Sequence, residues 1–529
     1  MKRQGLMACG VGLVVLVVLL GTASQGFVRD EGYYFRAARE YHAWFEHLFE
    51  RGLSSFADST LTHDFGYNTE HPGFVKLLMG WTWKIAHVWL GATSGATGFR
   101  LGSMLLVALG AAFTFLFGAR LSREHGVVVG LLAVAFLFTS PHVFFHAHLA
   151  AFDGPIMGLS VAATYAFWRA LTERRWLLPA LTLFGLALAT KHNAVFLWAG
   201  LGLAVSIARS RDWSFTEGRL SLPPLPLAWL LAPIAGLAVL YVFYPYGWAH
   251  PFQRIGAYYE YHAHHEHYPV DFFGAMYTSP PFPWGYAFRM TVLTVPLMTL
   301  VLGAVGLVWC ARRVRHAEGD ERMGLVLLLV SSLTPPLVIS FPMVPIFGGT
   351  KHWMPMMPFF CIAAALALVQ AMEAVRYRIA RPAVVVAALL VPLIDTVRTH
   401  PYGHTYFNEL TLGHQGAAVL GLPRTFWGGD ARPLLAALNE KAAIGARVYT
   451  HRMNYSDWQQ YLADGLARRD LVFVSDIASA DWALVNHQRE YQDAEYAVWE
   501  LGATLPTAMV AFDGVPIVSL YRLDRAAAR

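Results

Sequence analysis

Ionisable residues recur in this sequence beside the ends of long apolar stretches. Asp30 and Glu31 directly follow the first such stretch, in the segment FVRDEGYY. Four later motifs share this placement: Glu70 and His71 in NTEHPGF, Asp153 in FDGP, Lys191 and His192 in TKHN, and Lys351 and His352 in GGTKHW. A positioned carboxylate can act as a general base. Ionisable groups at membrane depth are costly and mark functional sites. The motifs therefore predict chemistry if the fold brings them to one face.

The chain is unusually apolar for its length. It has 529 residues, of which 56% are hydrophobic and 14% are charged, whereas a soluble protein carries about 25% charged residues. A membrane-spanning helix needs about 20 apolar residues in succession, and such blocks recur here. We therefore predict a polytopic membrane protein with about eleven spans, near residues 7–25, 99–119, 127–146, 154–171, 176–190, 193–209, 226–244, 290–310, 323–344, 353–372 and 382–398.

Basic residues gather in alternate connections between these blocks, for example at Arg120, Arg174 and Arg312. Such clusters mark the cytoplasmic side of a membrane protein, and they account for the net charge of +5 without a nucleic-acid partner. The basic start and its apolar run predict an uncleaved anchor, because the region around Ala23 is a poor cleavage site for a signal peptide. With this orientation, all the ionisable motifs fall on the outer face.

Two amphipathic helices are expected on the outer membrane surface. One carries Tyr34, Ala38 and Tyr41 at helical spacing, and a second should start at Pro72. Beyond residue 399, short β-like runs alternate with helical patterns, which predicts a small α/β domain. The predicted organisation is a transmembrane domain over residues 1–399 and an α/β domain on the outer face over residues 400–529.

Other interpretations of single residues stay open. Asp153 also fits a helix N-cap, and Lys191 fits a lysine that snorkels to the interface. Four clustered histidines could hold zinc: His262, His264, His265 and His267. Such clusters in a long loop are more often interfacial polar residues, so no metal site is predicted. The three cysteines lie in apolar blocks, and no P-loop or GxGxxG motif is present, so neither a disulfide framework nor a nucleotide is indicated.

Taken in order, the motifs resemble those of a known family. DEGYY resembles the first motif of the GT-C glycosyltransferases, in the branch of the protein O-mannosyltransferases and the ArnT-like lipid A aminoarabinose transferases. EHPGF, FDGPIMGL, TKHNAVF and GGTKHWMPMMPFF resemble four later motifs of this branch, in the same order. HPYGHTYFNEL and TFWGGD resemble the junction to a C-terminal periplasmic domain in bacterial members.

The resemblance implies a GT-C fold with its catalytic part in residues 1–399. It implies transfer of a sugar from a polyprenyl-phosphate-linked donor at the outer face of the bacterial inner membrane. Asp30 matches the family's general base, and Asp153 and Glu70 match further catalytic carboxylates. The substrate-binding positions are Glu31, His71, Lys191, His192, Lys351 and His352. No cofactor is implied beyond the lipid-linked donor, and a divalent metal has no support.

Individual roles differ within this set. Lys191 matches a contact to the donor phosphate, with His192 or Lys351 beside it, whereas His71 stands where some relatives have lysine. Helix neighbours face different ways, so Glu31 is expected either to contact the acceptor or only to orient the first surface helix. Tyrosines of the loop 244–289 suit interface anchoring better than sugar stacking.

Two other functional classes compete with a transferase. A secondary transporter would also use buried carboxylates and histidines, but transporters tend to bind substrates at the bilayer midplane between repeated halves. A non-catalytic envelope-assembly protein would use the C-terminal domain for docking. A cavity at the outer end that is lined by Asp30, Asp153 and Lys191 would favour the transferase. Neither the sugar nor the acceptor, whether lipid, protein or glycan, can be read from the sequence.

Overall fold

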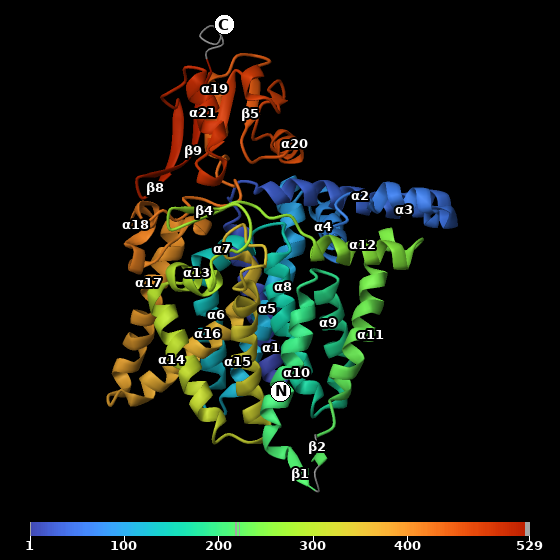
Figure 1. Ribbon diagram of the computed structural model, residues 1–529, viewed down its shortest axis with the longest axis vertical. Coiled ribbons are helices and arrows are strands. Elements are labelled where there is room, and N and C mark those ends of the chain that lie inside the picture. The colour runs from blue at the N-terminus through green and yellow to red at the C-terminus, as the bar shows by residue number, and fades with distance from the viewer. Residues whose placement is uncertain (1, 217–218, 222, 524–529) are drawn as a thin grey trace.

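The computed structural model describes residues 2–216, 219–221 and 223–523. A bundle of long apolar helices forms one part of the molecule, and a small domain with a β-sheet lies across one end of it (Figure 1). The bundle consists of α1 (Lys2–Gly21), α5 (Gly95–Leu121), α6 (Gly126–Phe138), α7 (Pro141–Ala147), α8 (Asp153–Ala170), α9 (Leu177–Leu188), α10 (Ala194–Ala208), α11 (Leu227–Val242), α14 (Leu297–Val314), α15 (Gly319–Ile339), α16 (Met357–Ala374) and α17 (Arg381–Thr399).

The number of spans is not settled by helix length. Six helices of the described residues are long and apolar enough to cross a membrane, and the pair α6 and α7, bent by 82°, adds a seventh. Nine of the eleven expected spans coincide with a single apolar helix, and α9 and α10 are separate helices on either side of the Thr190–His192 turn, as expected. The total of eleven stays a prediction, because the other helices are shorter or less apolar.

Prolines divide two of the predicted spans. The expected continuous span over 290–310 was wrong, because α13 (Tyr286–Thr294) ends before Pro296 and α14 begins after it. Val295, the residue before this proline, is extended at φ −88° and ψ 133°, as the clash with a following proline ring favours. Pro141 likewise opens α7 just after the bend from α6.

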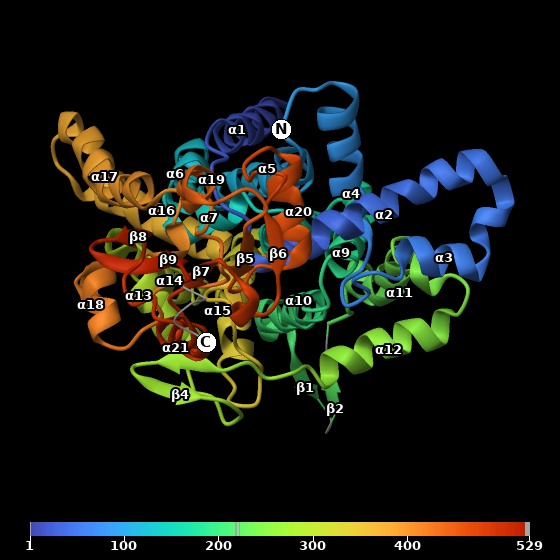
Figure 2. The ribbon, with the colours of Figure 1, turned by 90° about the horizontal axis from the view of Figure 1, so that it is seen from above.

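Four helices lie across the end of the bundle that faces the sheet domain (Figures 1 and 2). They are α2 (Arg29–Arg51), α3 (Asp58–Phe65), α4 (Phe74–Trp83) and α12 (Pro251–Ala263). The amphipathic character expected for α2 is confirmed, since Tyr34, Ala38 and Tyr41 are all buried. The expected start of the second helix at Pro72 was wrong by two residues. Gly73 is the N-cap of α4, and it donates its N–H to the Phe243 carbonyl at 2.7 Å.

The C-terminal domain contains a five-stranded sheet in the order β6-β5-β7-β9-β8. The strands are β5 (Arg447–Thr450), β6 (Val472–Val474), β7 (Trp482–Asn486), β8 (Ala508–Phe512) and β9 (Val515–Arg522). The helices of this region are α18 (Gly413–Val419), α19 (Leu434–Lys441), α20 (Tyr455–Ala463) and α21 (Asp493–Glu500). Strands β6, β5 and β7 pair in parallel, and β9 pairs antiparallel with β7 and β8. The α/β character is confirmed, and the boundary near residue 400 stays a prediction.

The edge strand β8 was missed by the sequence analysis. Its turn to β9 is Asp513-Gly514, and both residues have positive φ, 48° and 76°. An Asp-Gly pair with positive φ at both positions is the strongest short-range signal of a two-residue hairpin. The sequence therefore contained the signal for this strand.

The C-terminal domain holds the first turn of α2 at several points. Arg29 donates its backbone N–H to the Trp427 carbonyl at 3.0 Å, and the Asn454 amide donates to the Arg29 carbonyl at 2.5 Å. The Tyr461 hydroxyl accepts the Phe27 N–H at 2.7 Å. Backbone groups paired in this way fix the turn that carries Asp30.

Gly32→Ala should loosen this contact and lower the free energy of unfolding by about 1–3 kcal/mol. A Cβ at residue 32 would lie 2.4 Å from Asn454 Oδ1 and 2.6 Å from the Asp457 backbone nitrogen, so α20 must shift. The thermal unfolding midpoint of the detergent-solubilised protein measures the change. Gly256→Ala is the matched control, because no atom lies within 4 Å of its Cβ position in α12. An equal effect of both variants would show that α20 does not pack tightly against α2.

Candidate active site

Two adjoining cavities lie where the bundle meets the C-terminal domain. The outer cavity, of about 1000 Å³, is lined by α2, α12 and residues of the C-terminal domain such as Arg452 and Tyr491. The inner cavity, of about 480 Å³, extends among α8, α10 and α15 and is lined by Asp153, Lys191 and Phe359, among others. Residues that line both cavities mark their junction: Asp30, Glu70, Tyr261, Tyr268, Phe347 and Lys351.

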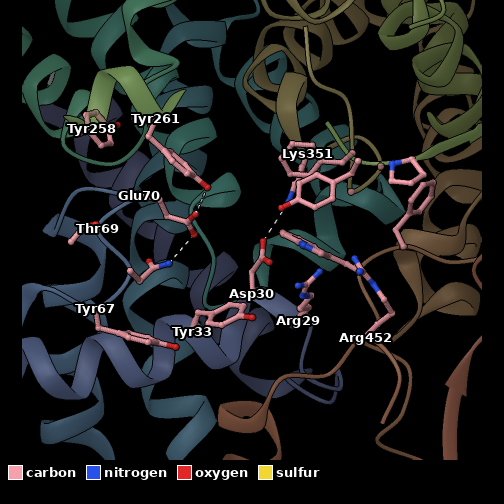
Figure 3. Close-up of a pocket in the computed structure, with 18 of the residues that line it drawn as sticks. Arg29, Asp30, Tyr33, Tyr67, Thr69, Glu70, Tyr258, Tyr261, Lys351 and Arg452 are labelled. Carbon is pink, nitrogen blue, oxygen red and sulfur yellow. Dashed lines mark hydrogen bonds and ion pairs between the residues drawn. The ribbon is translucent and has the colours of Figure 1, made fainter. Parts of the chain in front are cut away.

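Asp30 lies at this junction, in the first turn of α2. Its Oδ2 is 3.4 Å from Lys351 Nζ, and 26% of its side chain is exposed. The Lys351 ammonium is buried and also lies 3.8 Å from the centre of the Trp427 ring. Figure 3 shows Asp30 and Lys351 pointing toward each other across the cavity. A carboxylate that is accessible from both cavities is positioned to contact groups in each.

Glu31 has a different environment from its neighbour. It is fully buried and lines neither cavity. Its two oxygens accept hydrogen bonds from Arg100 Nε and Nη2, both at 2.7 Å, and Oε1 also accepts the Ala150 N–H at 2.8 Å. Oε2 accepts, at 3.2 Å, the N–H of Val28, which is the N-cap residue of α2. These contacts support the second expected role, orientation of the first surface helix, over contact with the acceptor.

Asp153 and Lys191 form a buried ion pair in the inner cavity. Lys191 Nζ is 2.7 Å from Asp153 Oδ1, and the two side chains are 9% and 4% exposed. Asp153 opens α8, where the N-terminal dipole favours a carboxylate. Lys191 lies in the turn between α9 and α10. Both residues therefore come from helix ends on the side of the bundle that carries α2.

Glu70 is held at the junction by polar neighbours. Its carboxylate accepts hydrogen bonds from Asn68 Nδ2 at 2.8 Å and from the Tyr261 hydroxyl at 3.0 Å. Behind it, Lys76 Nζ donates to the Asn68 and His71 carbonyls at 2.5 and 2.8 Å. Burial lowers the pKa of Lys76 to about 7, and the Glu70 charge opposes this. Lys76 was not among the predicted site residues, although a lysine within an apolar helix was a signal of a buried role.

Four histidines with unpartnered ring nitrogens line the inner cavity. Within the described part of the chain, one ring nitrogen of each is buried and without a hydrogen bond: His71, His192, His262 and His352. The His192 and His262 rings stack with centroids 3.8 Å apart. Burial lowers the pKa of His262 to about 4 and that of His71 well below its usual value. Their imidazoles are therefore neutral near pH 7 and can each donate or accept a hydrogen bond.

The histidines of the segment 262–267 do not converge on one point. His262 lies against His192, whereas the His265 ring stacks on Phe347 at 5.3 Å and His267 lies beside Phe282. Among the described residues, the group with close metal-ligand geometry is Glu124, His125 and Glu373, which lines neither cavity. The zinc interpretation thus gains no support from the arrangement of the four histidines.

The structure brings most of the predicted site residues together. Those that line a cavity are Asp30, Glu70, His71, Asp153, Lys191, His192, Lys351 and His352. Glu31 lies outside both linings. Arg29, Trp427 and Arg452 line the outer cavity and were not predicted from the sequence. Tyr261 and Tyr268, for which interface anchoring was expected, line both cavities.

Known proteins share features with this chain. Residues 70–240 match the family model of dolichyl-phosphate-mannose-protein mannosyltransferases, and this range includes Glu70, Asp153 and Lys191. The fold is similar to the crystal structure of ArnT from Cupriavidus metallidurans bound to undecaprenyl phosphate, with a TM-score of 0.52, 15% identity, and coverage of 97% of each chain. For the apo state of that protein the TM-score is 0.51 and the identity 14%, with coverage of 99% of this chain and 98% of that one.

No curated protein matches the chain by sequence. The expected GT-C fold is nevertheless confirmed, because the similarity to ArnT extends over almost the whole of both chains. The resemblance found in the motifs is also confirmed, by the mannosyltransferase family model over 70–240 and by the shared fold.

Proposed function

We propose that the protein is a membrane glycosyltransferase that moves a sugar from a polyprenyl-phosphate-linked donor to an acceptor. The observation that carries this proposal is the meeting of two cavities at Asp30, Glu70 and Lys351. A transferase must hold two substrates with their reacting atoms in contact, and alignment of this kind supplies much of the rate acceleration. The junction of the two cavities would bring one substrate from each cavity into contact beside the carboxylates of Asp30 and Glu70.

The donor fits the inner cavity. Lys191 and Lys351 supply positive charge for its phosphate, and the unpartnered histidine nitrogens can bond to sugar hydroxyls or phosphate oxygens. Apolar side chains line the deeper part of this cavity and suit a prenyl chain: Phe196, Leu197, Val338, Ile339 and Phe359. The structure of ArnT with undecaprenyl phosphate supports this choice of donor, since that protein shares the fold.

The acceptor fits the outer cavity, from which Asp30 can be reached. Asp30 takes the proton of the acceptor hydroxyl or amine as that group attacks the anomeric carbon. The bond between this carbon and the donor phosphate oxygen breaks in the same step, so the anomeric configuration inverts. Lys191 stabilises the charge that develops on the leaving phosphate, and Asp153 and Glu70 hold their neighbours in position.

The place of the site favours transfer over transport. Its ionisable residues come from helix ends and turns on the side of the bundle that carries the C-terminal domain (Figure 1). We place this side at the outer, periplasmic face of a bacterial inner membrane, on the basis of the basic residues in the opposite connections.

Purified protein in lipid nanodiscs, supplied with a panel of polyprenyl-phosphate sugars, tests the proposal. We expect at least one donor to lose its sugar, either to an acceptor or to water, with release of polyprenyl phosphate. Mass spectrometry of the lipid fraction measures this release. Movement of an intact donor or sugar across a proteoliposome membrane without bond cleavage would instead establish a transporter.

A further inference from the structure

The outer cavity contains a pair of arginines that the proposed reaction does not use. Arg29 comes from the first turn of α2, and Arg452 follows β5 in the C-terminal domain. Both line the outer cavity, and neither lines the inner cavity where the donor phosphate is placed. Figure 3 shows the two side chains side by side, close to Asp30.

Neither guanidinium is neutralised by a paired carboxylate. Among the residues that the structure describes, no ion pair joins Arg29 or Arg452 to an acidic side chain. Arg452 stacks on the Tyr491 ring at 3.9 Å, and its Nε is buried without a hydrogen-bond partner. Burial lowers the pKa of Arg452; Tyr491 opposes this effect and the Arg29 charge adds to it. Two cations thus lie close enough to repel each other.

Other charges of the outer cavity are engaged elsewhere. Arg254 pairs with Asp58 at 2.7 Å, and Lys351 pairs with Asp30. The charges of Asp30 and Glu490 raise the pKa of Arg452 from nearby, but neither carboxylate forms an ion pair with it among the described residues. The positive charge at Arg29 and Arg452 is therefore left for a ligand.

The backbone holds this pair in place. Arg452 has a φ of +65°, which is unfavourable for a residue with a side chain. The neighbouring Gly428 also has positive φ, and a Cβ there would lie 2.9 Å from Arg452 Cβ. Strained backbone of this kind persists where the surroundings fix it, often at ligand sites. Arg29 is fixed by its bonds to Trp427 and Asn454.

We propose that Arg29 and Arg452 form an anion subsite, which binds a phosphate or carboxylate of the acceptor beside Asp30. This inference rests on the proposed function and assigns to the C-terminal domain a part in acceptor selection. The planar guanidinium fork matches both phosphate and carboxylate oxygens. An acidic group held here places a neighbouring hydroxyl or amine of the acceptor within reach of the base.

Binding of three matched sugars to the full chain in nanodiscs tests the subsite. The probes are methyl glucoside, methyl glucoside 6-phosphate and methyl glucuronide, titrated calorimetrically at constant ionic strength without donor. We expect one or both acidic probes to bind roughly 10- to 100-fold more tightly than the neutral one, as charge-assisted bonds to two guanidiniums imply. Comparison of the affinities of the phosphate and carboxylate probes shows which of the two anions the subsite prefers.

Variants of Arg452 distinguish binding at this subsite from general attraction of anions to the positive charge of the protein. Arg452→Gln should remove most of the preference, and Arg452→Lys should keep part of it, since lysine retains the charge without the fork. Arg469→Gln, which removes an exposed arginine of the same domain, should leave the preference unchanged. Equal binding of all three probes by the wild type, no measurable binding of either acidic probe, or full preference in Arg452→Gln would overturn the subsite.

The result is independent of donor turnover. If no donor is cleaved while the acidic probes bind preferentially, the proposed function fails and the anion subsite stands. If donors are cleaved while the preference is missing, the acceptor is held by other groups.

Discussion

Asp30→Asn should reduce sugar transfer by roughly 10²–10⁴-fold, the usual contribution of a general base. The asparagine keeps the shape of the side chain but cannot accept the acceptor's proton. Asp30 is 26% exposed and lies 3.4 Å from Lys351, so its loss should destabilise the protein less than the loss of the fully buried Glu31. The rate of polyprenyl phosphate release, measured with a donor that the wild type cleaves, gives the effect. Turnover near the wild-type rate would remove Asp30 as the base.

Glu31→Gln provides the contrast, since the two acids are adjacent but differ in burial. Arg100 would lose its charged partner at a fully buried site, and breaking such a pair costs roughly 3–5 kcal/mol. We therefore expect a lower thermal midpoint and a lower yield of folded protein. The folded fraction should retain more activity than Asp30→Asn does. The opposite pattern, a stable Glu31→Gln protein without activity, would assign the catalytic role to Glu31.

The sequence could place the candidate residues on one face because they lie at or beside helix ends. Apolar blocks locate the helices, and the distribution of basic residues assigns their ends to one face. Asp153 at the start of α8 and Lys191 in the turn after α9 had to meet at that face, and they lie 2.7 Å apart. The same reasoning predicted Asp30 and Lys351 on one face. The two side chains lie 3.4 Å apart, although 321 positions separate them in the chain.

The features that escaped the sequence analysis depend on tertiary contacts. Arg452 reaches the cavity only because the C-terminal domain docks on α2 through residues such as Asn454, and periodicity carries no information on such docking. The choice between the two possible roles of Glu31 depends on its ion pair with Arg100. Arg100 lies within an apolar block, and this position gave no sign of the pairing. Proline breaks such as that at Pro296 were visible in the sequence, but a hydropathy criterion averages over them.

Lys191→Met should lower the rate of donor cleavage by roughly 10²–10³-fold, comparable to the loss of one preorganised donor to a developing negative charge. Methionine fills a similar volume without the charge, so donor affinity should also fall. The substitution has a second consequence, because it leaves Asp153 buried without a partner at 4% exposure. Such an unpaired carboxylate is destabilising, so a single variant would mix the loss of phosphate contact with a loss of folded protein.

The double variant Lys191→Met/Asp153→Asn separates these effects. With both charges removed, no buried charge is left unpaired, and the thermal midpoint should recover toward that of the wild type. Donor cleavage should stay low, because the phosphate still lacks its cation. Lys441→Met, at an exposed position of the C-terminal domain, controls for the loss of one positive charge. If the double variant regained both donor affinity and turnover, Lys191 would be only the structural partner of Asp153, and the donor phosphate would have to be held by Lys351 and the histidines of the inner cavity.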